Sequence, residues 1–478
     1  MKSAVKFRFL LFLWILSAGA YGQGIKKIFC DFRKDSALSG AVSAFKIVDL
    51  ASGKTITAYD ADRLMIPAST MKTLYVFSAL DDYGPDFRFA TSLLLDGTIR
   101  HDTLFGDVII RSEGDPSLAS PRFDESLDSL MADMAAALQR EGIRHITGGL
   151  VVSVNGFYYP APGSWPIEDA GNYYGSGYWG LNYLDNTYKI YLHPVPRPGM
   201  HVRVHHIEPP VDSLRLVSYL KSAARGTGDN AYIYGLPYTY KRFILGTVPA
   251  GEDFFVIKGA IPNPPLSFAR HLNRFLRQRG VQTQGPPRLT KTLVSEEGKR
   301  RIWHHLSPDL LHLGQKTLDY SINHYSEAMA RLVVEKRRPA DGYMNKDSIN
   351  AYFHRKGFRR IDLEDGCGLA PDNLIAPQEY TAMFRRIYRQ KGLAYLQNIL
   401  PHAGEDGYAK YFLPNSPVQS RVWVKSGSVS KVRNYVGIFR GKSGKYYAFA
   451  IMVNHFRSSH KAVKKAIEKA LERSIENL

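Results

Sequence analysis

The chain has 478 residues, which is enough for two or three domains of about 150 residues each. Hydrophobic residues make up 44% of it, an ordinary share for a globular protein. Beyond the N-terminus, no segment reaches the roughly 18 consecutive apolar residues that a membrane span needs. The formal charge of +19 favours anionic surfaces such as cell wall or lipid headgroups, although a solvated basic surface without a partner is the alternative.

The first 22 residues predict a signal peptide. A basic start is followed by an apolar run over residues 9–16 and by the small residues Ala20 and Gly22, which place cleavage after residue 22. A retained anchor is the alternative, but the run is short for one. We therefore expect export to the periplasm, which argues against a nucleic-acid partner. Cys30 and Cys367 form no disulfide framework, and their spacing leaves open whether they pair.

Predicted strands lie at both ends of the chain and helices between them. In chain order, the first elements are a short helix near 25–33, strands at 42–50 and 55–59, and an apolar helix from 74 to 80. The middle, 90–300, reads as one or two insertions, with helices at 124–141 and 267–279. The last elements are strands at 421–424, 434–439 and 446–454 and an amphipathic helix at 461–478. This order indicates one sheet built from the two termini.

The pattern Ser-x-x-Lys recurs along the chain, so its context has to select one copy. It occurs at Ser3, Ser43, Ser69, Ser218, Ser428 and Ser458. Of these, Ser69 alone follows a strand exit and opens a buried helix, where Lys72 lies on the same face and can reach its hydroxyl. The helix N-terminus favours negative charge on an attacking oxygen. An N-capping serine beside a solvated lysine is the alternative, and the apolar neighbours Leu74 and Phe77 argue against it.

Lys72 can act as an uncharged base only if its pKa falls below the ordinary lysine value of about 10.4. A nearby cation, such as a second lysine, lowers that pKa. Lys-Ser-Gly occurs at Lys425, after an apolar strand, and at Lys442, in a turn where these residues are common. We expect Lys425 to supply the cation and to hold a substrate carboxylate, while Gly427 leaves room for a ligand backbone. The predicted substrate-binding set is Lys425, Ser426, Gly427 and Ser428.

Ser-x-Asn is the third pattern, and it also occurs more than once. Its copies begin at Ser153, Ser321 and Ser348. The first reads as the end of a strand and the third as a polar surface helix. The second precedes an apolar helix, so we expect Ser321 to relay a proton to a leaving amine and Asn323 to orient Lys72 and the substrate amide.

These three patterns, in their chain order of Ser69-x-x-Lys72, Ser321-x-Asn323 and Lys425-Ser-Gly427, resemble those of serine β-lactamases and penicillin-binding proteins. The chain is similar to the class C low-molecular-mass penicillin-binding proteins, the penicillin-binding protein 4 type. The supporting stretches are 63–72, Gly114-Asp-Pro-Ser117, 165–175, Ser321-Ile-Asn323, Asp365-Gly-Cys-Gly-Leu369 and Lys425-Ser-Gly-Ser428.

The resemblance implies an α/β (α+β) fold, in which helices sandwich a five-stranded antiparallel sheet and a large insertion follows the nucleophile helix. The expected division is a signal peptide at 1–22, a catalytic domain at 23–90 plus 300–478, an inserted domain at 91–185 plus 259–299, and a nested subdomain at 186–258. The resemblance also implies a D-alanyl-D-alanine carboxypeptidase or endopeptidase that trims peptidoglycan peptides. Such an enzyme would be acylated by penicillin at Ser69, and the N–H groups of Ser69 and Ser428 would form its oxyanion hole.

Some positions of the resemblance bear on substrate preference. Asp169 lies four residues after Trp165, where relatives carry an Asp that contacts the amino group of a diamino acid; a surface carboxylate is the alternative. The sequence departs from the family at Cys367, where a Ser is usual, at Pro371 and at Lys431. The preferred peptide, the choice between carboxypeptidase and endopeptidase, and the oligomeric state therefore stay open.

Three other classes compete with this interpretation. A β-lactamase or serine esterase of the same fold would turn penicillin over, whereas a non-catalytic cell-wall scaffold would never be labelled by it. A metal enzyme would use the histidines at 201, 205 and 206 or at 304 and 305, but neither group has a zincin pattern. We expect no metal and no cofactor, and possible peripheral contact with the membrane or the cell wall.

Overall fold

The computed structural model describes residues 24–155, 160–193, 195–251, 253–336 and 344–478. The predicted signal peptide lies outside these described residues. The chain forms two compact units, and each is described by itself. The first unit holds the described residues up to Leu74 together with Gly314–Ser321 and Ile349–Leu478, and the second holds those of Tyr75–Leu313 and Ile322–Ser348. The expected domain boundaries stay a prediction.

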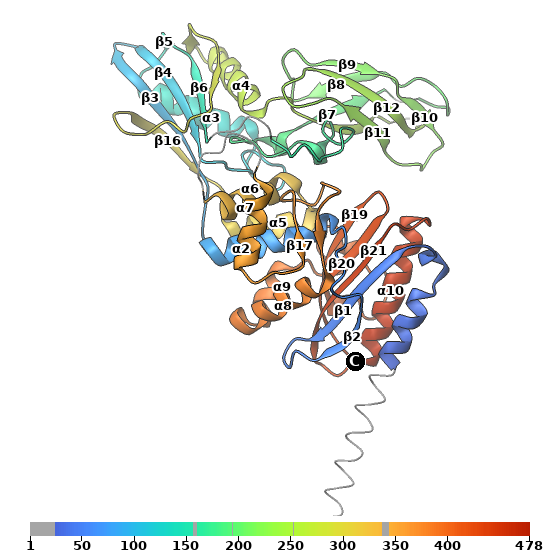
Figure 1. Ribbon diagram of the computed structural model, residues 1–478. Coiled ribbons are helices and arrows are strands. Elements are labelled where there is room, and N and C mark those ends of the chain that lie inside the picture. Colours follow the sequence, from blue (N-terminus) through green and yellow to red (C-terminus); the bar gives the residue numbers. More distant parts are fainter. Residues whose placement is uncertain (1–23, 156–159, 194, 252, 337–343) are drawn as a thin grey trace, which may run out of the picture. The chain divides into compact units, whose positions relative to one another are not determined.

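The first unit is built around one five-stranded antiparallel sheet with strand order β19-β20-β21-β1-β2 (Figure 1). Its strands are β1 (Val42–Asp49), β2 (Thr55–Tyr59), β19 (Val422–Val429), β20 (Val432–Arg440) and β21 (Tyr446–Asn454). The first strand of the chain pairs with the last, for example Lys46 with Ala450. The predicted sheet made from both termini, and the α/β fold class, are confirmed.

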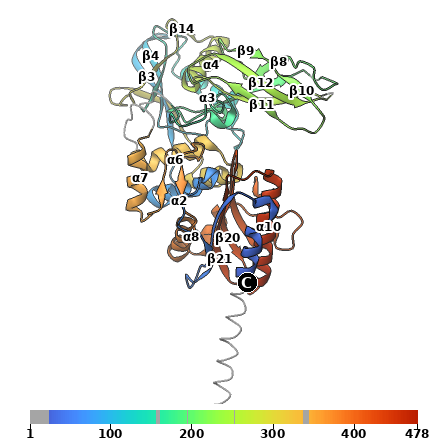
Figure 2. The same cartoon turned by 45° about the vertical axis from the view of Figure 1, so that its right-hand side comes forward.

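Helices cover both faces of this sheet, as Figures 1 and 2 show. On one face lies α10 (His460–Asn477), whose Val463, Ile467 and Leu471 form an apolar stripe at helical spacing and enter the same core as sheet residues. The helical residues 24–33 share this core through Ile25 and Phe29. The helix α8 (Pro377–Lys391) contacts β1, β20 and β21. The smaller elements here are η1 (Ser36–Leu38), β17 (Ile361–Asp362), β18 (Leu374–Ile375), α9 (Leu393–Ile399), η5 (Ala409–Tyr411) and η6 (Gln419–Arg421).

The described residues of the second unit form three sheets. The largest has strand order β14-β5-β4-β3-β16, with β6 beside β4 and β15 beside β6; a second has β13-β7-β8, and a third has β10-β12-β11 with β9 beside β12. The strands are β3 (Ala90–Arg100), β4 (Thr103–Ser112), β5 (His145–Ile146), β6 (Leu150–Val154), β7 (Thr187–Leu192), β8 (Val204–Glu208), β9 (Arg215–Ser218), β10 (Lys221–Ala223), β11 (Asn230–Tyr234), β12 (Lys241–Pro249), β13 (Phe255–Ala260), β14 (Gln282–Thr283), β15 (Arg288–Thr290) and β16 (Arg300–Leu306).

Two helices pack on the largest of these sheets. They are α3 (Leu127–Arg140) and α4 (Pro264–Gln278), and the apolar stripe of each enters one core with the sheet strands. Side chains of Ser126 and Asn263 accept hydrogen bonds from backbone N–H groups of the first turn, so each helix begins at a polar cap. The remaining elements are α6 (Asn323–Glu335), η3 (Tyr173–Gly175) and η4 (Leu184–Asn186).

Three helices carry the chain from one unit to the other, namely α2 (Lys72–Tyr83), α5 (Leu310–Tyr320) and α7 (Lys346–Arg355). In α2 the residues from Leu74 to Leu80 are almost completely buried, which confirms the helix that the apolar run predicted. Within the described residues, none of the helices combines the length and the apolar character that crossing a membrane would require.

Candidate active site

Ser69 lies at the start of a buried helix. It belongs to the 3-10 turn η2 (Ala68–Met71), which runs directly into α2. The Nζ atom of Lys72 lies 2.8 Å from Ser69 Oγ and donates a hydrogen bond to the carbonyl of Cys367 at 2.6 Å. The side chain of Lys72 is fully buried, so the alternative of a solvated lysine is wrong. A buried amine is thus held against a partly exposed hydroxyl.

The backbone before Ser69 is fixed by two buried asparagines of the sheet. The side chain of Asn434, on β20, donates to the carbonyls of Ile66 and Pro67 at 2.8 and 2.9 Å. Asn454, on β21, accepts a hydrogen bond from the Ile66 N–H at 2.8 Å. Because both amides are buried and hydrogen-bonded, they hold the segment before the nucleophile in one position.

The carbonyl that Lys72 contacts lies in a loop shaped by Asp365. This fully buried carboxylate accepts backbone hydrogen bonds from Gly368, Leu369 and Ala370 at 2.7 to 2.9 Å. Gly368 has a φ of +86°, and a Cβ there would lie 2.1 Å from the carbonyl oxygen of Ala68. The stretch Asp365-Gly-Cys-Gly-Leu369 therefore packs its backbone against the residue before Ser69, which only glycine at position 368 permits.

Lys425 lies within β19, which is longer than the sequence predicted. The strand continues through Val429 because Lys425, Ser426, Gly427 and Ser428 all pair with β20. A Cβ at Gly427 would lie 2.5 Å from the Pro67 carbonyl oxygen, so this glycine makes room for the turn that carries Ser69. This close approach within the protein is a second reason for glycine at position 427, and its role in leaving space for a ligand backbone stays a prediction.

The two lysines of the predicted site influence each other electrostatically. Lys425 is 1% exposed, and burial lowers its pKa well below the ordinary value. The charge of Lys72 lowers the pKa of Lys425 further, as does Arg433, while the carboxylate of Asp319 raises it. The pKa of Asp319 is itself raised to about 6, mainly by burial and then by Asp406. Charge repulsion of this kind disfavours two protonated lysines together.

Replacing Asp319 by asparagine tests this electrostatic coupling. Above about pH 6 the Asp319 carboxylate is charged and favours protonated Lys425, so its removal lowers the pKa of Lys425 further. We expect the alkaline limb of the pH profile for acylation by penicillin to move to lower pH in Asp319→Asn. Replacing the exposed Asp62 in the same way should leave that limb in place. A limb that stays fixed or moves to higher pH in Asp319→Asn would contradict the coupling.

A cavity of about 310 Å³ in the first unit brings several predicted residues together. Its lining residues are Ser69, Ser321, Tyr408, Ala409, Tyr411, Phe412, Val424, Ser426, Ser428, Arg433, Tyr435 and Lys464. Four predicted serines, Ser69, Ser321, Ser426 and Ser428, thus face one space. Lys425 is not among the lining residues, which agrees with its burial.

Arg433 and Lys464 are cationic lining residues that the sequence reasoning missed. Arg433 pairs with Ser428 across the hairpin, and its Nε donates to the Tyr435 hydroxyl at 2.9 Å. A tight hairpin after Ser428 places Arg433 opposite it, whereas the residue pattern predicts strands only at 421–424 and 434–439 and leaves Arg433 outside both. Lys464 comes from α10, whose approach to the cavity has no local signal in the sequence.

The predicted residues Asn323 and Asp169 belong to the second unit, where both contact Tyr174. Asn323 is the first residue of α6, and its Nδ2 donates to the Tyr174 carbonyl at 2.7 Å. The Tyr174 hydroxyl forms a hydrogen bond with the Asp169 carboxyl. Burial raises the pKa of Asp169 to about 6, and the hydrogen bond opposes this rise. Asp169 is thus half-buried and hydrogen-bonded, unlike an ordinary surface carboxylate.

The histidines of the competing metal hypothesis take part in other contacts. His201 and His304 contact the Ser218 carbonyl and the Ser92 hydroxyl, respectively, at 2.9 and 3.0 Å. Within the described parts of the chain, neither histidine group places three ligand atoms within 4.8 Å of one another.

Comparison with known proteins places the chain in a family. A model of the D-Ala-D-Ala carboxypeptidase 3 (S13) family matches residues 29–478, and the chain therefore belongs to this family. The D-alanyl-D-alanine carboxypeptidase DacB of Haemophilus influenzae is 25% identical over 427 residues, 87% of this chain and 86% of the relative. The D-alanyl-D-alanine carboxypeptidase of an Actinomadura species is 24% identical over 446 residues, 88% and 79% of the two chains. The predicted family is confirmed.

The fold is likewise shared with a solved structure. The crystal structure of penicillin binding protein 4 (dacB) from Haemophilus influenzae has a TM-score of 0.79 and 22% identity, and the match covers 92% of this chain and 98% of that one. The structure of that protein complexed with a novel β-lactam matches with a TM-score of 0.73 and 21% identity, covering 94% and 98%. The expected penicillin-binding fold is confirmed.

Proposed function

We propose that this member of the family hydrolyses the D-Ala-D-Ala bond of peptidoglycan stem peptides through an acyl-enzyme on Ser69. The observation that carries the proposal is the buried amine of Lys72, 2.8 Å from the Ser69 hydroxyl. An uncharged Lys72 takes the hydroxyl proton as Ser69 Oγ attacks the carbonyl carbon of the penultimate D-Ala. Charge repulsion between the two lysines, which lowers the pKa of Lys425, would equally favour an uncharged Lys72 whenever Lys425 holds the proton.

The later steps use the residues that line the cavity. The N–H groups of Ser69 and Ser428 are proposed to bind the oxyanion, and Ser321 relays the proton to the leaving amine. Collapse of the tetrahedral intermediate breaks the C–N bond and releases terminal D-Ala. Water then attacks the ester, and Lys72 takes its proton, so that Ser69 regains its hydroxyl and the shortened peptide leaves.

The terminal carboxylate of the substrate needs positive charge and hydrogen-bond donors. Ser426, Ser428 and Arg433 line the cavity and can offer both, while Lys425 contributes its charge from the buried side of β19. Asn323 is proposed to orient the substrate amide and Asp169 to bind the amino group of a diamino acid. Because the pKa of Asp169 is about 6, this second contact would weaken as pH falls through that value.

The location and partners of the protein are proposed on the same grounds. The N-terminal signal sequence supports export to the periplasm, where peptidoglycan peptides are the substrates and β-lactams act as inhibitors. The formal charge of +19 supports contact with anionic cell wall or membrane surfaces.

Two measurements test the function. Intact-protein mass spectrometry after exposure to benzylpenicillin should show one added penicilloyl group, and peptide mapping should locate it on Ser69. Digestion of purified sacculi should release free D-Ala if the protein is a carboxypeptidase, or separate cross-linked peptides if it is an endopeptidase. Rapid turnover of penicillin without a stable adduct would support a β-lactamase instead, and absence of both adduct and turnover would support a non-catalytic scaffold.

A further inference from the structure

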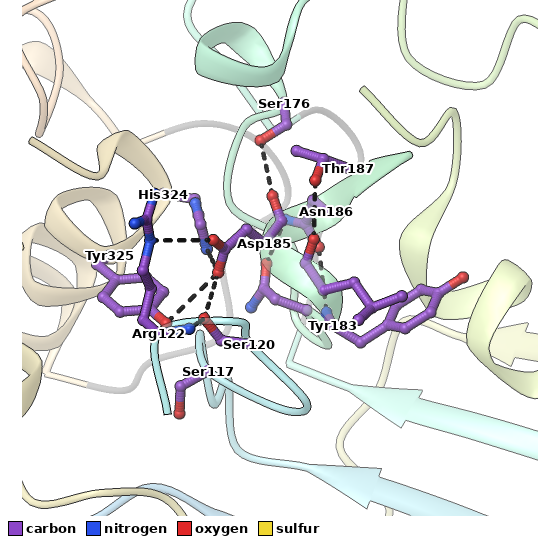
Figure 3. Close-up of polar contacts among 12 residues, drawn as sticks. Ser117, Ser120, Arg122, Ser176, Tyr183, Asp185, Asn186, Thr187, His324 and Tyr325 are labelled. Atoms are coloured by element: carbon purple, nitrogen blue, oxygen red, sulfur yellow. Dashed lines mark hydrogen bonds and ion pairs between the residues drawn. The ribbon is translucent and has the colours of Figure 1, made fainter. Parts of the chain in front are cut away.

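Asp185 is the centre of a buried polar cluster in the second unit (Figure 3). Its Oδ1 accepts a hydrogen bond from the Ser120 hydroxyl at 2.6 Å and lies 3.5 Å from the hydroxyl of Tyr325. The Nε2 of His324 lies 3.7 Å from Oδ1, and the Nε of Arg122 lies 3.8 Å from Oδ2. His324 and Tyr325 immediately follow Asn323 in the chain, so this cluster is built on the first turn of α6.

The backbone at Asp185 adopts an unfavourable conformation. Leu184, Asp185 and Asn186, which form η4, all have a left-handed φ, at 51°, 55° and 57°. Such a conformation costs a residue other than glycine on the order of 1 kcal/mol or more, so it persists only where surrounding contacts fix it. The buried Asn186 side chain provides such contacts, since it donates to the Gly177 carbonyl at 3.0 Å and to the Asn182 side chain at 2.9 Å. The strained turn carries Asp185 toward α6, as Figure 3 shows.

The first turn of α6 has no side-chain cap from its own N-cap residue. Its N-cap residue is Ile322, which offers no side-chain hydrogen bond to the free N–H groups. A carboxylate near a helix N-terminus interacts favourably with the positive end of the helix dipole. The imidazole of His324 is almost fully buried, and burial lowers its pKa, so its uncharged form adds no competing cation to this turn at neutral pH.

We propose that Asp185 is a positioning residue for the hydrolytic reaction, because it fixes the first turn of α6 and thereby the orientation of Asn323. The Asn323 side chain is held at its amide by the Tyr174 carbonyl, which accepts a hydrogen bond from Nδ2. The inference rests on the proposed function, since Asn323 matters only if it takes part in acylation. Asp185 itself touches no reacting atom and acts through Asn323.

The test compares two carboxylate-to-amide changes in the second unit. Asp185→Asn keeps the shape of the side chain and removes its charge, and we expect the second-order rate of acylation by a fluorescent penicillin to fall about 10- to 100-fold. Asp107→Asn is the matched control, because Asp107 accepts hydrogen bonds from the Gly149 N–H at 2.8 Å and from Arg288 and has a structural role only. Its acylation rate per folded molecule should equal that of the wild type, whatever its melting temperature.

A double-mutant cycle separates positioning from general destabilisation. If Asp185 acts through Asn323, then Asp185→Asn should cause no further loss of acylation rate in an Asn323→Ala background. If the rate losses of the two single variants multiply in the double variant, the proposal is overturned. A wild-type acylation rate in Asp185→Asn alone would also overturn it. Asp185→Glu restores the charge and should recover part of the rate. Failure of the function itself has a different signature, since wild-type protein would then carry no penicilloyl group on Ser69.

Discussion

Replacement of Ser69 by alanine should abolish covalent labelling by penicillin completely. The Oγ atom is the proposed site of bond formation, and nothing in an alanine side chain can replace it. The change removes one partly exposed hydroxyl at the start of η2, so the melting temperature should stay within a few degrees of the wild type. Loss of labelling together with a folded protein, measured by mass spectrometry and thermal unfolding, is the expected result.

Ser428 provides a demanding comparison for Ser69. It also precedes a lysine by three residues, at Lys431, and it lines the same cavity. It lies in the strand β19, however, and Lys431 lies in the turn that follows this strand, so the helical spacing that brings Lys72 to Ser69 is absent here. We expect Ser428→Ala to be labelled more slowly but to the same final extent. If labelling survives in Ser69→Ala and disappears in Ser428→Ala, then the nucleophile is Ser428 and the assignment to Ser69 is wrong.

Replacement of Gly368 by alanine should damage both stability and acylation. An alanine at a φ of +86° costs about 1–2 kcal/mol, and the new Cβ would collide with the Ala68 carbonyl oxygen, 2.1 Å away. Relief of this collision must move either the loop that contacts Lys72 or the residue before Ser69. We therefore expect the free energy of unfolding to fall by about 3 kcal/mol and the acylation rate of the folded protein to fall about 100-fold.

Gly444 isolates the effect of the collision from that of backbone strain. Its φ of +84° is almost the same as that of Gly368, but no atom lies within 4 Å of a Cβ built there. The free energy of unfolding of Gly444→Ala should therefore fall only by the cost of the backbone conformation, and its acylation rate should equal that of the wild type. Denaturant unfolding measures the free energy of unfolding of the two variants, and penicillin labelling measures their acylation rates. Equal behaviour of the two variants would contradict a role for the Gly368–Ala68 contact.

Local pattern was sufficient to predict the helix start that brings Lys72 to Ser69 and the central sheet. A polar Ser and Lys in an otherwise apolar helix imply burial of the amine, and alternating strands at both ends imply a sheet closed by distant segments. The extent of β19 was underestimated, because Lys-Ser-Gly-Ser reads as a loop unless its pairing with β20 is known. Asp185 carries no local signal at all, since its partners lie about 65 and 140 residues away in the chain. Sequence patterns therefore could not predict those features of the fold and the site that depend on contacts between distant segments.

The two asparagines behind Ser69 have a consequence for biosynthesis. The segment before Ser69 accepts a hydrogen bond from Asn434 and donates one to Asn454, and these bonds span 368 and 388 residues of sequence. The strands that bear them, β20 and β21, are synthesised long after Ser69. A growing chain that has not yet reached these strands therefore has its serine but not the support that holds it, and the hydrolase becomes competent only once β20 and β21 have been made and have folded against this segment.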